Sequence, residues 1–149
     1  MIKHVWSLAC WRAVVDSRTN NIYIQQVIEH IQLRIEPHPD FSIPLEMEII
    51  SYWVRGPENE PEKGEVRISF RRPSGSERVV HQDILDLESN ERLRTLLTFE
   101  KIGLPELGRY TFVVDQRVSE DEWMNVAEIP LFVSYDPDGE THPSEPTEN

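Results

Sequence analysis

The chain has 149 residues, of which 38% are hydrophobic, and carries a formal net charge of -12. A chain of this length is the size of one domain and buries about two thirds of its unfolded surface. It therefore needs no structural metal, and its single Cys excludes an intramolecular disulfide framework. A strongly acidic surface repels phosphate backbones and anionic lipid, so nucleic acid and membrane surfaces are unfavourable partners.

The N-terminal residues resemble a lipoprotein signal only superficially. The apolar stretch before Cys10 is short, Ser7 stands where such a signal has Leu, and Trp11 and Arg12 continue a strand pattern. No apolar run approaches the roughly 20 residues of a membrane span. We expect a cytoplasmic protein whose Cys10 is a small buried thiol.

Residues 4–15 are rich in β-forming side chains and carry apolar residues on both faces, which predicts a strand covered on both sides. Turn-forming residues 16–21 then predict a hairpin with residues 22–35. That segment also shows helical apolar spacing, so a helix stays open. Its Ile, Val and Tyr content favours a strand with a bulge.

Further strands are expected over residues 42–55, 65–71, 77–82 and 93–102. In the first of these, Met47 and Ile49 point inward, and a slip of phase at Ile50 would bring Tyr52 and Val54 inward as well. Val66, Ile68 and Phe70 alternate with polar residues in the second strand, the clearest half-buried pattern of the chain. Residues 83–94 fit either a short helix or a strand.

The stretch 104–115 predicts a corner followed by a strand. Gly108 lies just before Tyr110, and Tyr110, Phe112 and Val114 share one face. In immunoglobulin-like sandwiches, a Tyr at such a corner is buried and its hydroxyl bonds to backbone a few residues upstream. We expect the same of Tyr110. A late strand over residues 129–135 completes the pattern.

These elements predict an all-β fold: a single antiparallel, immunoglobulin-like β-sandwich of seven to eight strands over residues 1–135. Residues 136–149 contain five acidic residues and no Lys or Arg, which predicts a disordered acidic tail.

No motif for catalysis, cofactor binding or metal binding is present. The five histidines, at positions 4, 30, 38, 81 and 142, have no metal-ligand spacing. The acidic stretch 136–140 lacks the ligand positions of a calcium loop. We therefore expect no catalytic residues, no cofactor and no metal.

Three tryptophans are the candidate partner-binding residues: Trp6, Trp11 and Trp123. Trp6 and Trp11 lie on opposite faces of one strand, so at least one faces a less buried side, and Trp123 stands in a polar turn. An exposed Trp marks a protein-binding surface or, in a β-sandwich, a platform on which a sugar ring stacks.

Two segments of the chain together resemble a family of small bacterial β-sandwich proteins of uncharacterised function. One is the Cys10 strand with the turn 16–21 and residues 22–29, and the other is residues 108–114 followed by 129–133. The resemblance implies the fold over residues 1–135 and supplies no catalytic residues.

For function we expect a non-enzymatic module that binds a protein partner. The alternatives are a carbohydrate-binding sandwich that uses exposed Trp side chains, and an enzyme without a recognisable motif. The apolar strand 4–15 has few charges to protect an open edge, so it would pair with a second copy or be covered by another protein. Otherwise it runs between other strands, with both faces covered internally.

Overall fold

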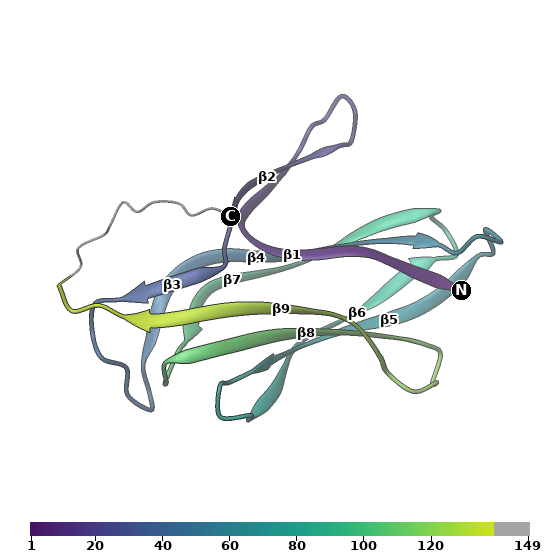
Figure 1. The fold of residues 1–149 in the computed structure, drawn as a ribbon. Coiled ribbons are helices and arrows are strands. Elements are labelled where there is room, and N and C mark those ends of the chain that lie inside the picture. Colours follow the sequence, from purple (N-terminus) through teal and green to yellow (C-terminus); the bar gives the residue numbers. More distant parts are fainter. Residues whose placement is uncertain (139–149) are drawn as a thin grey trace.

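A computed structural model describes residues 1–138 and contains nine strands in that range (Figure 1). They are β1 (Ile2–Val15), β2 (Ile22–Val27), β3 (His30–Leu33), β4 (Ser42–Arg55), β5 (Glu62–Arg71), β6 (Glu77–Leu87), β7 (Arg92–Gly103), β8 (Gly108–Val118) and β9 (Met124–Tyr135). The predicted tail falls mostly outside the described residues, although the Asp136 N–H donates to the Leu33 carbonyl at 2.8 Å. Within residues 1–138 there is no helix that could cross a membrane.

The strands form two sheets, and the all-β prediction is confirmed. Sheet A has four strands in the order β2-β1-β4-β7, and sheet B has five in the order β3-β9-β8-β5-β6. All neighbours are antiparallel except β3 and β9, which run parallel, so the prediction of purely antiparallel pairing is wrong at this edge. Parallel pairing arises because the chain enters β3 directly from the opposite sheet.

Residues 22–35 form two strands rather than one, which accounts for a ninth strand where seven to eight were expected. The strand interpretation is confirmed and the helix is excluded. Gln26 has a φ of 56°, and after Val27 the chain leaves sheet A and joins sheet B at His30. A residue in the left-handed region changes the direction of a strand, and this explains the change in the apolar pattern.

The predicted slip of phase in β4 is wrong. Met47, Ile49 and Trp53 are all fully buried and lie on one continuous inner face, so Tyr52 points to the outer face. The irregularity in β4 lies earlier, between Pro44 and Met47. Ile50 is apolar because its outward position is also covered, with only 4% of the residue exposed.

The remaining segments follow the predicted alternation. Val66, Ile68 and Phe70 are buried in β5. The turn after β5 is closed by a hydrogen bond from the Arg72 N–H to the Ser76 carbonyl at 2.8 Å. Residues 83–94 contain the end of β6 and the start of β7, so the strand alternative holds there.

The core lies between the two sheets and is built around aromatic rings. Phe70 stacks on both Tyr110 and Phe112, with ring centroids 5.2 and 4.6 Å apart. Trp53 enters the core from sheet A, and its indole N–H donates to the Thr95 hydroxyl at 3.0 Å. The polar atom of the largest fully buried side chain therefore has a hydrogen-bond partner within the protein.

The predicted tyrosine corner is present. Tyr110 is fully buried, and its hydroxyl donates to the Glu106 carbonyl at 2.7 Å and accepts from the Glu106 N–H at 3.0 Å. Gly108 has a φ of 126°, a conformation that a side chain would strain. Burial raises the pKa of the Tyr110 phenol, so the hydroxyl keeps its proton and acts as a donor.

Tyr110→Phe removes both hydrogen bonds and leaves the backbone N–H and C=O of Glu106 without this partner. We expect the free energy of unfolding to fall by about 1–3 kcal/mol. Urea denaturation measures the loss, and Tyr135→Phe, at a more exposed ring, is the control. Equal stability of the two variants would show that the corner contributes nothing.

Phe112→Ala removes a fully buried ring that contacts Phe70 and Phe99. The transfer and cavity costs together predict a loss of about 3–5 kcal/mol. The matched variant is Phe132→Ala in β9, where 49% of the residue is exposed and the loss should be far smaller. A thermal melt that is unchanged by Phe112→Ala would remove this ring from the core.

Candidate functional site

Strand β1 changes its pairing partner halfway along its length. Residues Ile2 to Cys10 pair with β4, whereas Cys10 to Val15 pair with β2, so the two neighbours overlap only at Cys10. Each half of β1 therefore has a strand on one side only. β1 is central in the strand order, as the alternative of a strand that runs between other strands predicted. On the side of its first half away from β4, the Ala9 carbonyl accepts a hydrogen bond from the Ile28 N–H at 2.9 Å.

The two open edges of β1 have different surroundings. On its first half, Ser7, Leu8 and Ala9 line an apolar groove of about 580 Å³ against Ile129 and Pro130 of β9. On its second half, the carboxylate of Glu48 takes the place of a neighbouring strand and accepts the Ala13 N–H at 2.8 Å. Because a side chain and not a strand accepts the Ala13 N–H, another chain could pair along this edge of β1.

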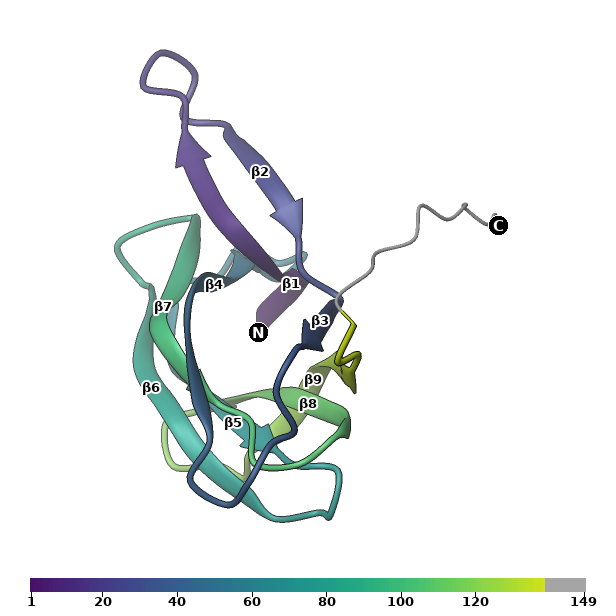
Figure 2. The same ribbon diagram turned by 90° about the vertical axis from the view of Figure 1, so that its left-hand side faces the viewer.

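The second half of β1 forms a hairpin with β2, the edge strand of sheet A, and this hairpin projects beyond the other strands (Figures 1 and 2). This hairpin carries a group of exposed apolar side chains: Trp11, Val14, Val15, Tyr23 and Val27. Tyr23 is 61% exposed and Val15 is 53% exposed. Large apolar side chains gathered on a projecting element are typical of a surface that another molecule covers.

The outer face of sheet A is apolar where β1 crosses β4. Cys10 and Ile50 are both buried there, although neither belongs to the core between the sheets. Burial raises the pKa of the Cys10 thiol, which disfavours the reactive thiolate. The expectation of a buried structural thiol is confirmed.

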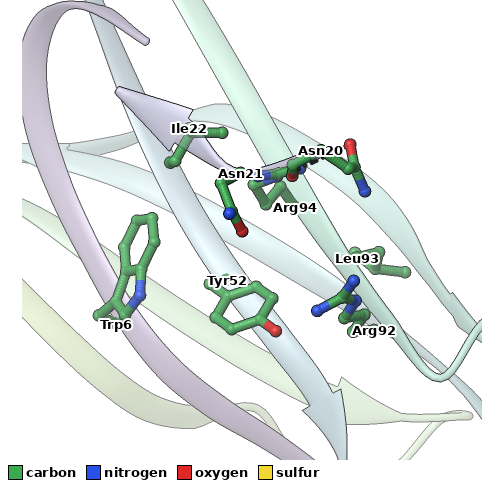
Figure 3. Close-up of a pocket in the computed structure, with 8 residues that line it drawn as sticks. All are labelled: Trp6, Asn20, Asn21, Ile22, Tyr52, Arg92, Leu93 and Arg94. Atoms are coloured by element: carbon green, nitrogen blue, oxygen red, sulfur yellow. Dashed lines mark hydrogen bonds between the residues drawn. The ribbon is translucent and has the colours of Figure 1, made fainter. Parts of the chain in front are cut away.

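A pocket lies between this outer face and the turn of the hairpin (Figure 3). It has a volume of about 530 Å³. Trp6 and Tyr52 occupy adjacent positions on β1 and β4, with ring centroids 5.8 Å apart and ring planes at 40°. The remaining lining residues come from the hairpin turn and from β7: Asn20, Asn21, Ile22, Arg92, Leu93 and Arg94.

Arg94 joins the hairpin to sheet A. Its Nη2 donates to the backbone carbonyl of Asn20 at 2.8 Å and to the side-chain oxygen of the same residue at 3.1 Å. Arg92 lies two residues earlier on β7 and lines the same pocket. Within the described residues, neither guanidinium has a carboxylate within 4.0 Å, whereas five arginines elsewhere do: Arg12, Arg18, Arg67, Arg71 and Arg117.

Trp123 lies on the other sheet, between two arginines. The guanidinium carbons of Arg67 and Arg117 are 4.3 and 4.5 Å from its ring centroid. Each arginine is also ion-paired across β5 and β8, Arg67 to Asp115 at 3.0 Å and Arg117 to Glu65 at 2.6 Å. Trp123 is therefore half-buried rather than exposed, and its ring already makes two cation–π contacts.

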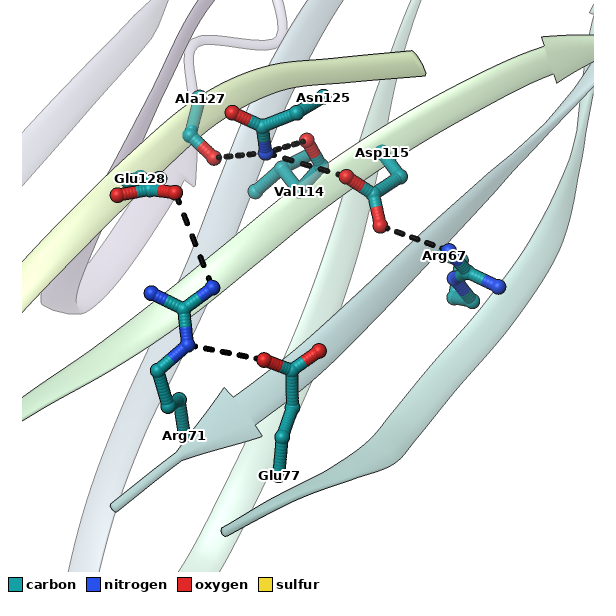
Figure 4. A network of polar contacts seen from close by, with 8 residues as sticks. All are labelled: Arg67, Arg71, Glu77, Val114, Asp115, Asn125, Ala127 and Glu128. Carbon is teal, nitrogen blue, oxygen red and sulfur yellow. Dashed lines mark hydrogen bonds and ion pairs between the residues drawn. The ribbon is translucent and has the colours of Figure 1, made fainter. Parts of the chain in front are cut away.

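The outer face of sheet B extends this polar network (Figure 4). The Asn125 amide lies within hydrogen-bonding distance of the Asp115 carboxylate and of the Val114 and Ala127 carbonyls, at 3.1–3.3 Å, where the pairing of β8 and β9 shifts register. Arg71 contacts Glu77 at 2.9 Å and Glu128 at 3.9 Å. The three arginines of this network, Arg67, Arg71 and Arg117, thus each have a carboxylate partner on sheet B, although the buried Nε of Arg67 has no hydrogen-bond partner among the described residues.

A chain of polar side chains runs from His4 toward the core. His4 Nε2 lies 2.7 Å from the Ser7 hydroxyl, which lies 2.6 Å from the Ser51 hydroxyl, and the imidazole packs against Trp53. A His–Ser contact is one part of a nucleophilic site. No carboxylate of the described chain hydrogen-bonds the other nitrogen of His4, so the third group of such a site is missing.

Burial lowers the pKa of His4 below its ordinary value of about 6.5. The unfolded chain therefore binds a proton at this residue more readily than the folded chain does. The stability contributed by neutral His4 is complete above about pH 6.5 and is lost as the pH falls from there through the lower folded-state pKa.

His4→Gln should therefore weaken the pH dependence of stability. Between about pH 7 and pH 5.5, we expect the free energy of unfolding to fall less in this variant than in the wild type. Urea denaturation followed by Trp fluorescence measures both slopes. His38→Gln, at an exposed histidine, is the matched control, and identical slopes for His4→Gln and wild type would contradict the assignment.

The three predicted partner-binding residues are not brought together. Trp6 lines the pocket on sheet A, Trp11 is exposed on the hairpin, and Trp123 is stacked on sheet B. The predicted phase of β4 wrongly placed Tyr52 on the inner face. The contact between Tyr52 and Trp6 could therefore not be predicted from the sequence. The sequence offered no indication that Arg92 and Arg94 belong to a site, apart from their spacing of two positions. Among residues 1–138, no three His, Cys, Asp or Glu side chains converge as metal ligands would.

The chain matches no model of a known protein family, and no curated protein matches it either.

Proposed function

We propose that this chain is a non-enzymatic interaction module that binds a protein partner through the β1–β2 hairpin. The observation that carries the proposal is the exposure of Trp11, Val14, Val15 and Tyr23 on a hairpin that projects beyond the other strands of sheet A. We also propose that the fold is an immunoglobulin-like sandwich, which the tyrosine corner supports.

The mode of binding that fits this element is addition of a strand. β2 is the outermost strand of sheet A, and the second half of β1 has no strand on its other side. A partner strand gains main-chain hydrogen bonds along either edge, and the exposed apolar side chains supply specificity. Arg12 is the only charged residue between Lys3 and Asp16, so little opposes pairing along β1.

The test compares capture of binding partners by three forms of the full chain. Val15→Lys combined with Tyr23→Lys places two charges on the hairpin and should abolish capture of a specific partner from the native cells. Val79→Lys combined with Ile84→Lys, at exposed apolar positions of β6, is the matched control and should retain it. A partner retained equally by all three forms would exclude the hairpin.

Light scattering on the same proteins distinguishes self-association of this chain from binding of a different protein. Self-association through the hairpin predicts a dimer for the wild type and the control, and a monomer for the hairpin variant. A monomer for all three forms would leave a different protein as the partner.

Carbohydrate binding is the second candidate, and the position of Trp6 in a pocket favours it. A sugar ring stacks on a flat aromatic face, and Asn20 and Asn21 would bond hydroxyl groups. The 40° angle between the rings of Trp6 and Tyr52 is less suited to this than a coplanar pair. Binding on a glycan array that is lost with Trp6→Leu would place this function first.

A further inference from the structure

The pocket under the hairpin has an aromatic floor. Trp6 and Tyr52 are cross-strand neighbours on the outer face of sheet A, and their rings are tilted by 40° (Figure 3). A flat ligand that lies on one of these rings meets the other ring at an angle. The volume of about 530 Å³ is in the range of about 300–1,000 Å³ that holds small organic ligands.

The charged side chains of the pocket are both cationic. Arg94 is directly opposite Tyr52 in the pairing of β4 and β7, and Arg92 is opposite Val54 on the same face. Among residues 1–138, no Asp or Glu lines the pocket. In a chain with 27 acidic and 15 basic residues, two neighbouring arginines without a carboxylate partner are a local reversal of charge.

The arginines also retain donors for a ligand. Arg94 uses a single nitrogen, Nη2, for Asn20, and a guanidinium carries five N–H donors. No hydrogen bond from the Arg92 side chain to the described chain occurs. Planar guanidinium groups bind carboxylate and phosphate in a bidentate manner, which makes an acidic group the best-matched occupant.

We propose that this pocket binds a small organic anion that combines a ring with a carboxylate or phosphate. The acidic group lies on Arg92 and Arg94, the ring packs on Trp6 and Tyr52, and the amides of Asn20 and Asn21 bond its polar edge. Neutral sugars lack the group that the arginines select. The site lies beneath the hairpin and uses none of the exposed apolar side chains Trp11, Val14, Val15 and Tyr23, so it does not depend on the protein-binding function.

Isothermal titration calorimetry with two matched ligand pairs tests the proposal on the full chain. The pairs are adenosine monophosphate with adenosine, and glucuronate with glucose. In at least one pair we expect the acid to bind with a dissociation constant on the order of 1 mM or tighter. Its neutral counterpart should bind at least tenfold more weakly, and the pair that responds identifies the ring as aromatic or as a sugar.

Four variants locate the binding. Arg92→Gln removes a charge that makes no side-chain hydrogen bond to the part of the chain that the structure describes, and Trp6→Leu removes the floor. Each should weaken binding of the acid tenfold or more. Arg109→Gln and Trp11→Leu, outside the pocket, are the matched controls and should bind as the wild type does. Added salt should weaken binding to the wild type more than binding to Arg92→Gln.

Three results would overturn the proposal. They are equal affinity for acid and neutral ligand, no saturable binding of either acid up to about 10 mM, and binding that Arg92→Gln leaves unchanged. Circular dichroism of each variant confirms that the sheets are retained, so that a loss of binding is not a loss of fold.

Discussion

A β-strand satisfies its backbone hydrogen bonds on both edges only where a neighbour lies on each side, and β1 has one neighbour at a time. It pairs with β4 up to Cys10 and with β2 from Cys10 onward. The second half pairs with β2 and projects as a hairpin. The open edges, the exposed apolar side chains and the pocket beneath the turn all follow from this exchange of partners.

The two sheets use their outer faces differently. Sheet B pairs charges across neighbouring strands, with Arg67 opposite Asp115 and Arg117 opposite Glu65, and Trp123 packs between the two arginines. Such cross-strand pairs neutralise charge within the sheet, although the Arg67 Nε has no hydrogen-bond partner among the described residues. Sheet A instead presents Trp6 and Tyr52 beside Arg92 and Arg94, whose charges no carboxylate of the described chain balances.

Much of the fold could be predicted because it depends on local periodicity. The alternation of Val66, Ile68 and Phe70 fixes the inner face of β5, and Gly108 followed by Tyr110 fixes the corner before β8. Both signals need only a few consecutive residues. The phase of β4 was wrong because Ile49 and Ile50 are apolar on opposite faces, and periodicity cannot tell which of two adjacent apolar residues faces the core.

The sequence by itself determined the class of the fold, the hairpin turn at residues 16–21, the buried Tyr110 and the buried Cys10. Tertiary structure alone decided that β1 divides its pairing between β4 and β2, and that β3 lies parallel to β9. It also decided that Asn20 meets Arg94, 74 residues later in the chain, over the rings of Trp6 and Tyr52. Side-chain alternation is a local property of one strand, whereas partners and pockets depend on where distant strands come to lie.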